Sequence, residues 1–209
     1  AHHGAGNALH GHNYMDGVSA MIRFQNVSAT RQGNRILDNI NLAINDGEFV
    51  LLLGPNGSGK SYLLNLMAAL RVPRVGEVFL EGKRLTKMSE RQKRAWRAGL
   101  GLIPSDPVLL NGYTVLEGLV LTAQLLGKSA ADAKRNALES ASLCGLDPYL
   151  NARAESLSVG VKKRVVIARS LVNQPRLILA DSPLEGLDDQ AQESFSIFAP
   201  SSAKSVIRL

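Results

Sequence analysis

One run of eight residues restricts the fold of this chain more than any other segment: Gly54-Pro55-Asn56-Gly57-Ser58-Gly59-Lys60-Ser61. Its pattern, G-x-x-x-x-G-K-[ST], is typical of a loop whose glycines let backbone N–H groups turn inward around phosphate oxygens. The continuous apolar run 49–53 before it indicates a strand buried on both faces, and the helical spacing of apolar residues from Leu63 to Leu70 indicates a helix after it. A buried strand before the loop and a helix after it are the flanks of a phosphate-binding loop. The N-terminus of the helix adds positive potential at the phosphate site.

The loop predicts that the chain binds a nucleoside triphosphate. Lys60 is expected to reach the β- and γ-phosphates, and the Ser61 hydroxyl is expected to bind Mg²⁺. The predicted binding residues extend to Tyr62, directly after the loop. A carboxylate at the end of another buried strand is also needed on the metal side, and Asp181 supplies it after the apolar run 177–180. We therefore expect Ser61 and Asp181 to be the metal ligands.

The composition excludes several classes of protein but does not identify one class. Apolar residues at 45% and charged residues at 20% exclude a wholly disordered chain. The single cysteine, Cys144, excludes an internal disulfide framework. The longest apolar runs are far shorter than the roughly 20 residues of a membrane-spanning helix. A net charge of +6 leaves nucleic acid or an acidic surface open as a partner.

The first 20 residues are predicted to be a tag or a disordered leader. All 4 histidines fall within residues 2–12, among Gly, Ala and Asn and without an apolar period. A metal-binding arm is the alternative interpretation of these histidines. Residues 21–209 are predicted to form one nucleotide-binding domain, and because no histidine follows residue 12, any mechanism that needs one must take it from another chain.

The order of the apolar patterns predicts an α/β fold. Alternating residues at 21–27 and 36–44 indicate an antiparallel N-terminal β-lobe, and the buried runs 49–53 and 177–180 indicate a mostly parallel core sheet. Helical patterns between them indicate a helical subdomain at about residues 105–165. We therefore predict a P-loop NTPase core with two additions, the antiparallel N-terminal β-lobe and the helical subdomain.

A second segment carries a resemblance to a known family. The run Leu157-Ser158-Val159-Gly160-Val161-Lys162-Lys163-Arg164 and the residues 165–171 after it resemble the signature segment of ATP-binding cassette (ABC) transporter ATPases, which normally begins Leu-Ser-Gly-Gly-Gln. It lies just before the strand that ends at Asp181, as in that family. Ser105 falls where the family has its Q-loop glutamine, and Gly186-Leu187-Asp188 resembles its D-loop. Asn173-Gln174-Pro175 is most similar to the branch of lipoprotein-releasing, macrolide-exporting and cell-division ATPases.

The resemblance implies a function and an assembly. It implies that ATP and Mg²⁺ are the cofactors and that two ATP-binding domains, as a homodimer or a heterodimer, pair head to tail. Ser158 and Gly160 of one domain would then approach the nucleotide of the other. It also implies a transmembrane permease as partner, transport driven by ATP, and a position on the cytoplasmic face of the cell membrane. The resemblance implies that the permease, not this chain, selects the transported substrate.

The catalytic motifs depart from the family pattern at several positions. Ser182 stands where the family has a general-base glutamate, and a serine hydroxyl cannot accept the proton of the attacking water in its place. Ser105 is too short for the role of the Q-loop glutamine. Val159 and Val161 replace a glycine and the glutamine of the signature, and Arg31 stands near the position of the aromatic residue that stacks on adenine. These departures predict that the chain binds ATP but hydrolyses it poorly.

Two explanations for the departures stay open at this point. The chain is either a natural degenerate subunit or a shortened or altered version of an ordinary ATPase. The domain is expected to be truncated at its C-terminal end, because the family's switch histidine would follow the last residue, Leu209. Truncation does not explain Ser105, Val159 or Ser182.

An alternative function is a soluble ATP-switched module of the same fold that acts on nucleic acid. The basic cluster of residues 83–97 leaves it open, although a solvated helix face is the favoured explanation of the cluster. The absence of a coiled-coil insertion between the loop and the signature argues against the DNA-repair relatives. We therefore expect no nucleic-acid partner.

Overall fold

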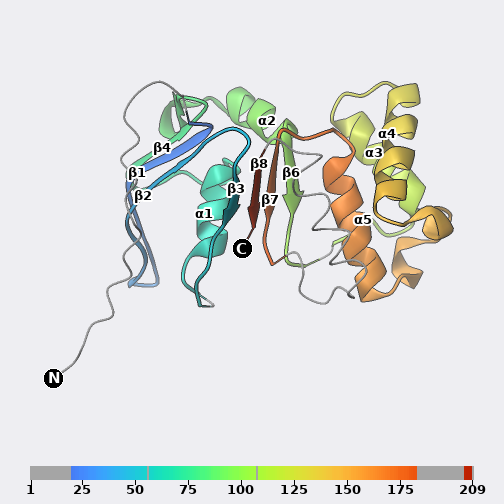
Figure 1. The fold of residues 1–209 in the computed structure, drawn as a ribbon, viewed down its shortest axis with the longest axis horizontal. Coiled ribbons are helices and arrows are strands. Elements are labelled where there is room, and N and C mark those ends of the chain that lie inside the picture. The colour runs from blue at the N-terminus through green and yellow to red at the C-terminus, as the bar shows by residue number, and fades with distance from the viewer. Residues whose placement is uncertain (1–19, 56, 107, 183–204, 209) are drawn as a thin grey trace.

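The core sheet of the protein lies between an antiparallel sheet and a group of three helices (Figure 1). The computed structural model describes residues 20–55, 57–106, 108–182 and 205–208. The predictions for the leader at residues 1–19, for Asn56 and for Gly186-Leu187-Asp188 lie outside these residues.

The N-terminal sheet has the strand order β2-β1-β4-β5 and is antiparallel throughout. Its strands are β1 (Ile22–Arg31), β2 (Asn34–Ile44), β4 (Val75–Leu80) and β5 (Lys83–Arg84). The β1–β2 turn places Gln32 and Gly33 at positive φ, as a tight hairpin turn requires. The predicted antiparallel lobe is confirmed.

The core sheet has the order β3-β8-β7-β6, and all its pairings are parallel. Its strands are β3 (Phe49–Leu51), β8 (Ser205–Arg208), β7 (Leu177–Ala180) and β6 (Leu100–Ile103). Every residue of β7 is buried, as its uninterrupted apolar sequence predicts. The predicted mostly parallel sheet is therefore confirmed.

Strand β3 does not meet the expectation of a strand buried on both faces. Phe49 and Leu51 are 54% and 47% exposed. The reason is its place in the sheet, since among the described strands β3 lies at the edge and pairs only with β8.

The helices divide between the two sides of the core sheet. Helix α1 (Lys60–Met67) packs against the N-terminal sheet, and α2 (Glu90–Ala98) lies between β5 and β6 in the chain. On the other side lie α3 (Val115–Leu125), α4 (Ala130–Leu143) and α5 (Val159–Leu171) (Figure 1). Three short 3₁₀ turns, η1 (Leu85–Lys87), η2 (Asp147–Tyr149) and η3 (Ala154–Ser156), complete the described elements.

Strand β7 separates two hydrophobic cores. Leu177 and Leu179 pack with the N-terminal sheet and α1, whereas Ile178 and Ala180 pack with helices α3 to α5. This alternation is the two-residue period of a strand. The side chains of one short strand thus hold both halves of the molecule to the same sheet.

Trp96 of α2 joins several elements around its indole ring. It is buried, and its Nε1 donates a hydrogen bond to the backbone oxygen of Met67 at 2.7 Å. The Arg176 guanidinium lies 4.8 Å from the ring centroid and forms an ion pair with Glu81. These contacts connect α1, α2, the β4–β5 turn and the start of β7.

None of the helices that the structure describes combines the length and the apolar composition needed to cross a bilayer.

The contact between β4 and β1 at Gly76 yields a stability prediction. Gly76 has φ +79°, and a Cβ there would clash with the backbone carbonyls of Gln25 and Asn26, at an irregularity in the β1–β4 register. Gly76→Ala is therefore expected to lower the free energy of unfolding by roughly 2 kcal/mol or more. Urea unfolding followed by circular dichroism measures this change.

Gly118 provides the matched control. It lies within α3, and a Cβ there would meet no atom within 4 Å. Gly118→Ala should raise the free energy of unfolding by up to about 1 kcal/mol, because alanine is the better helix former. Equal effects of the two substitutions would contradict this account of the β1–β4 contact.

Candidate functional site

The carboxyl edge of the core sheet gathers the residues that the sequence singles out. In the parallel β6–β7 pair Ile103 lies opposite Ala180, and the Asp181 backbone N–H donates to the Ile103 carbonyl at 2.8 Å. Strand β7 is parallel to β8, and β8 to β3, so the segment after each strand leaves the sheet at the same edge. Ligands of open α/β sheets bind outside this edge.

The predicted phosphate-binding loop begins at Gly54, shortly after the end of β3, and packs closely against β2. Gly59, the residue before α1, has φ +90°, and a Cβ there would lie 2.7 Å from the Ile36 carbonyl oxygen and 2.8 Å from Leu37 Cδ2. At Gly54, an added Cβ would lie 2.8 Å from Ser58 Oγ. Gly59 is therefore needed for close packing as well as for backbone conformation.

Lys60, the first residue of α1, reaches back across the loop. Its Nζ donates hydrogen bonds to the carbonyl oxygens of Gly54 at 2.8 Å and Pro55 at 3.1 Å. The Pro55 carbonyl also accepts from the Ser58 N–H at 3.2 Å. Both acceptors of the ammonium group are neutral, so its charge remains able to attract an anion.

A cavity of about 530 Å³ opens over this loop, and segments far apart in the sequence line it. This volume is in the range of small-molecule binding sites. The lining residues are Thr30, Arg31, Ile36, Gly57, Gly59, Lys60, Ser61, Tyr62, Asn65, Arg71, Asp181 and Ser182.

The lining of the cavity includes residues that were predicted to bind nucleotide and residues that the sequence did not indicate. Arg31, Tyr62, Asp181 and Ser182 lie with the loop, as expected of one nucleotide site. Ser182 has φ +47°, so the backbone turns sharply directly after Asp181.

Four lining residues were missed by sequence reasoning: Thr30, Ile36, Asn65 and Arg71. Asn65 could have been found, because it lies three residues after Tyr62 on the same helix. No sequence signal marks Arg71.

The remaining predicted residues lie outside the lining of this cavity. Ser105 follows β6 and is exposed. Ser158 is the N-cap of α5, where its Oγ accepts from the Val161 N–H at 3.4 Å, and Gly160 lies in the first turn. Val159 beside them is 64% exposed. The signature segment thus presents a helix N-terminus away from the chain's own loop cavity.

Arg169 of α5 supports the segment after Ser105, a role that no sequence motif indicates. Its Nη1 donates to the Val108 carbonyl at 2.8 Å. Burial lowers the pKa of the Arg169 guanidinium, because desolvation disfavours its charged form. The arginine therefore ties the segment that follows β6 to helix α5.

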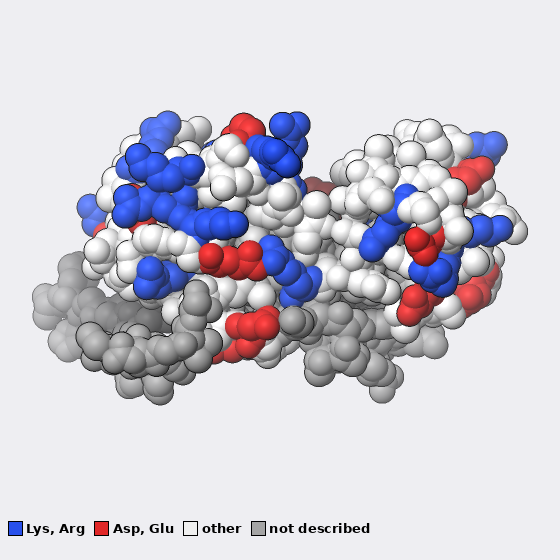
Figure 2. Space-filling view, turned by 90° about the horizontal axis from the view of Figure 1, so that it is seen from above, with Lys and Arg blue, Asp and Glu red and all other residues white. Residues whose placement is uncertain are grey.

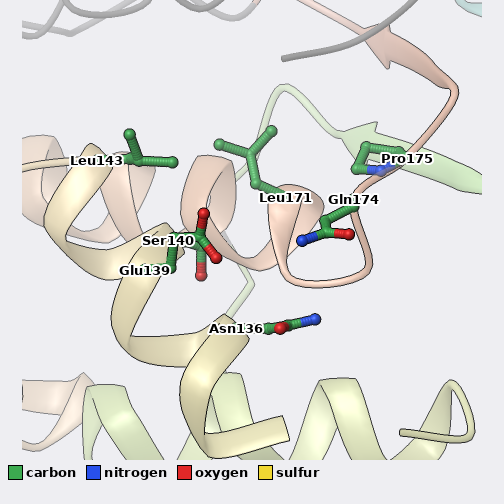
Figure 3. A pocket seen from close by; sticks show the side chains of 7 residues that line it. All are labelled: Asn136, Glu139, Ser140, Leu143, Leu171, Gln174 and Pro175. Atoms are coloured by element: carbon green, nitrogen blue, oxygen red, sulfur yellow. The ribbon is translucent and has the colours of Figure 1, made fainter. Parts of the chain in front are cut away.

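A second cavity, of about 280 Å³, lies between α4 and the turn from α5 to β7 (Figure 3). Its lining includes Asn136, whose Nδ2 donates to the Val172 carbonyl at 3.0 Å, and Glu139 and Gln174. It contains none of the predicted nucleotide-binding residues. The loop cavity is therefore the candidate nucleotide site.

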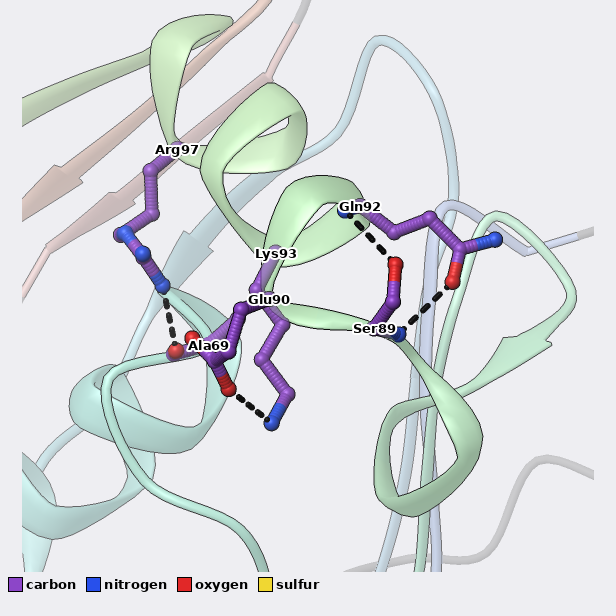
Figure 4. Close-up of polar contacts among 6 residues, drawn as sticks. All are labelled: Ala69, Ser89, Glu90, Gln92, Lys93 and Arg97. Atoms are coloured by element: carbon purple, nitrogen blue, oxygen red, sulfur yellow. Dashed lines mark hydrogen bonds and ion pairs between the residues drawn. The ribbon is translucent and has the colours of Figure 1, made fainter.

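The basic cluster of residues 83–97 covers β5, η1 and α2, and Lys and Arg side chains gather on one half of the molecule in Figure 2. Part of the cluster has structural partners. Lys93 pairs with Glu90 at 2.9 Å, and the Arg97 Nη1 donates to the Ala69 carbonyl at 2.8 Å, beside the Ser89–Gln92 capping box of α2 (Figure 4). Trp96 within the cluster is buried, so its ring is not free to stack on a base.

Comparison with known proteins identifies the family. The sequence profile described as ABC transporter matches residues 37–185, which contain the loop, the signature segment and Asp181. The chain belongs to the ABC transporter family. Among its relatives, the lipoprotein-releasing system ATP-binding protein LolD of Bacteroides thetaiotaomicron is 34% identical over 174 residues, which cover 83% of this chain and 80% of that protein. LolD of Ehrlichia ruminantium (strain Gardel) is 42% identical over 165 residues, 78% of this chain and 72% of that protein.

Solved ABC cassettes have the same fold. The ATP-binding cassette MJ0796, solved as a dimer in a post-hydrolysis state with ADP and Pi, superposes with a TM-score of 0.80 at 30% identity, over 90% of this chain and 87% of that one. These findings confirm the first expected function, an ATP-binding subunit of a membrane transporter. Nothing in them supports the nucleic-acid alternative.

The Lys60 geometry predicts a loss of ATP binding in Lys60→Ala. Removal of the loop's cation should weaken ATP binding about 10- to 100-fold, the range expected for a lost hydrogen bond to a charged group. Isothermal titration calorimetry measures the affinity. Lys134→Ala, which removes an exposed lysine of α4, is the matched control. Unchanged affinity in Lys60→Ala would rule out this loop as the phosphate site.

Proposed function

We propose that this ABC subunit binds Mg·ATP through its own loop but hydrolyses it slowly, within a membrane complex of the lipoprotein-releasing type. One observation carries the proposal: Ser61, Asp181 and Ser182 line the same cavity as the loop, and Ser182 stands where the family has a carboxylate. The binding groups are thus present, whereas the proton acceptor is replaced.

The residues of the cavity fit a magnesium nucleotide. Ser61 and Asp181 offer a hydroxyl and a carboxylate oxygen, and Mg²⁺ in proteins usually takes one or two such ligands together with phosphate and water. Bound Mg²⁺ would neutralise charge on the β- and γ-phosphates. Lys60 adds a cation, and the N–H groups at the start of α1 add partial positive charge.

Slow turnover follows from the chemistry of Ser182 and Ser105. A general base contributes about 10²- to 10⁴-fold to a rate, and a neutral hydroxyl is too weak a base to supply this contribution. Ser105, at the position of the Q-loop glutamine, is exposed and outside the lining of the cavity. The two departures weaken the proton acceptor and the link from nucleotide to transport domain, and they leave the phosphate ligands intact.

The assembly that we propose is a dimer of ATP-binding domains on a transmembrane permease, at the cytoplasmic face of the membrane. The N-terminus of α5, with Ser158 and Gly160, would face the nucleotide of a second domain. Two features support this arrangement. The segment lies outside its own chain's loop cavity, and MJ0796 is described as a dimer.

Ser182→Glu tests the catalytic part of the proposal. The unaltered chain should release phosphate from ATP very slowly, and the restored carboxylate should raise the rate by about 10-fold or more. The gain should be partial, because Ser105 and Val159 remain. A phosphate-release assay on the two purified chains measures the rates.

The control is Ser142→Glu, which adds the same charge at an exposed position of α4 and should leave the rate unchanged. Turnover by the unaltered chain of about 1 per second or more would mean that another residue supplies the base. The proposal of slow hydrolysis would then be wrong.

ATP should also promote dimerisation. Sedimentation velocity with and without Mg·ATP measures the fraction of dimer, which we expect to rise with ATP and to rise further in Val159→Gly. The reason is that the exposed β-branched Val159 resists close approach to a phosphate. A chain that stays monomeric at saturating ATP would contradict a homodimer and favour a partner with an intact signature.

A further inference from the structure

An aromatic ring and a guanidinium group form one wall of the loop cavity. The Arg71 Cζ lies 5.6 Å from the centroid of the Tyr62 ring, and both residues line the cavity. The Arg71 backbone N–H donates to the Asn65 carbonyl at 3.2 Å, which holds the segment after α1 against the helix. Because Tyr62 and Asn65 are three residues apart, they share this face of α1.

The two groups differ in how they are held. The Tyr62 ring is half-buried and packs against the hydrophobic core of the N-terminal sheet, so its orientation is fixed by packing. Arg71 is exposed, and it takes part in none of the ion pairs among the described residues. The result is a packed ring with an exposed planar cation beside it.

The cavity also extends beyond the groups that bind phosphate. We assign Lys60, Ser61 and Asp181 to the phosphates and Mg²⁺, whereas β1, β2, the outer face of α1 and the segment after α1 line another part of the cavity. This remaining space would take the ribose and the base. A nucleobase stacks on aromatic rings and on guanidinium planes, and the Tyr62–Arg71 pair offers both.

We infer that Tyr62 and Arg71 form the stacking platform for the nucleobase, in place of residue 31. The inference rests on the proposed binding of ATP and adds the residues that hold the base. Arg31 lies at the end of β1 and is exposed, and none of the ring contacts of the described residues involves it. The platform has thus moved from the β1–β2 hairpin to helix α1 and the segment that follows it.

The test compares ATP with inorganic tripolyphosphate, because both fit the loop and only ATP has a base. Calorimetry in the presence of Mg²⁺ gives the ratio of the two affinities for each variant of the full chain. Tyr62→Ala should lower this ratio about tenfold, the usual effect of losing one base–aromatic stack. Arg71→Ala should lower it about threefold, as expected for an exposed cation–π partner. Tyr62→Phe keeps the ring and should keep the ratio within about twofold.

Two further variants make the outcome decisive. Lys60→Ala should weaken both ligands and leave their ratio nearly unchanged, and Arg31→Ala should lower the ratio less than Tyr62→Ala does. A larger fall in Arg31→Ala would place the base on residue 31 and overturn the platform. Equal losses for ATP and tripolyphosphate in Tyr62→Ala and Arg71→Ala would make these residues phosphate ligands, and would overturn the platform while leaving the proposed function intact. Absence of ATP binding by the unaltered chain would instead overturn the proposed function.

Discussion

Strand β7 is paired in parallel on both edges and buried on both faces, and the position of Asp181 relative to the loop depends on this arrangement. Parallel pairing sends the segments after β3, β6 and β7 to one edge of the sheet, where Asp181 meets the loop. Burial on both faces fixes the strand's register, because a shift by one residue would exchange Leu179 and Ala180 between the two cores. The catalytic edge and the hydrophobic cores are therefore specified by the same four residues.

The parts of the site that could be predicted from the sequence are those made by backbone and local pattern. The loop at 54–61 has a fixed spacing because N–H groups bind phosphate, and the run that ends at Asp181 is apolar because it is buried. The antiparallel lobe and parallel sheet follow from alternating and continuous apolar patterns. The exposure of β3 could not be predicted in this way, because an apolar run does not show whether a strand lies at the centre or the edge of a sheet.

The wall of the cavity that faces the base was harder to predict for a different reason. Arg71 reaches the site through the end of α1, a backbone hydrogen bond to Asn65 and a contact with Tyr62, and the direction of the chain after a helix end has no sequence pattern. Arg169 is a similar case, since its hydrogen bond to Val108 spans 61 positions of sequence. Side chains that act through tertiary contacts leave no periodic signal, so resemblance pointed to Arg31 whereas the packed ring lies at position 62.

The departures from the family pattern differ in what they would change. In the proposed mechanism, Ser182 and Ser105 would alter proton acceptance and coupling, and Val159 would alter the approach of a second domain. Lys60, Ser61 and Asp181 would carry the attraction for Mg·ATP, and none of them departs from the pattern. A site of this kind would hold nucleotide while the covalent step is slow, because binding energy shared equally by ground and transition states does not accelerate the step. Energy from ATP binding would then be available for domain association, and an intact partner site would have to supply turnover.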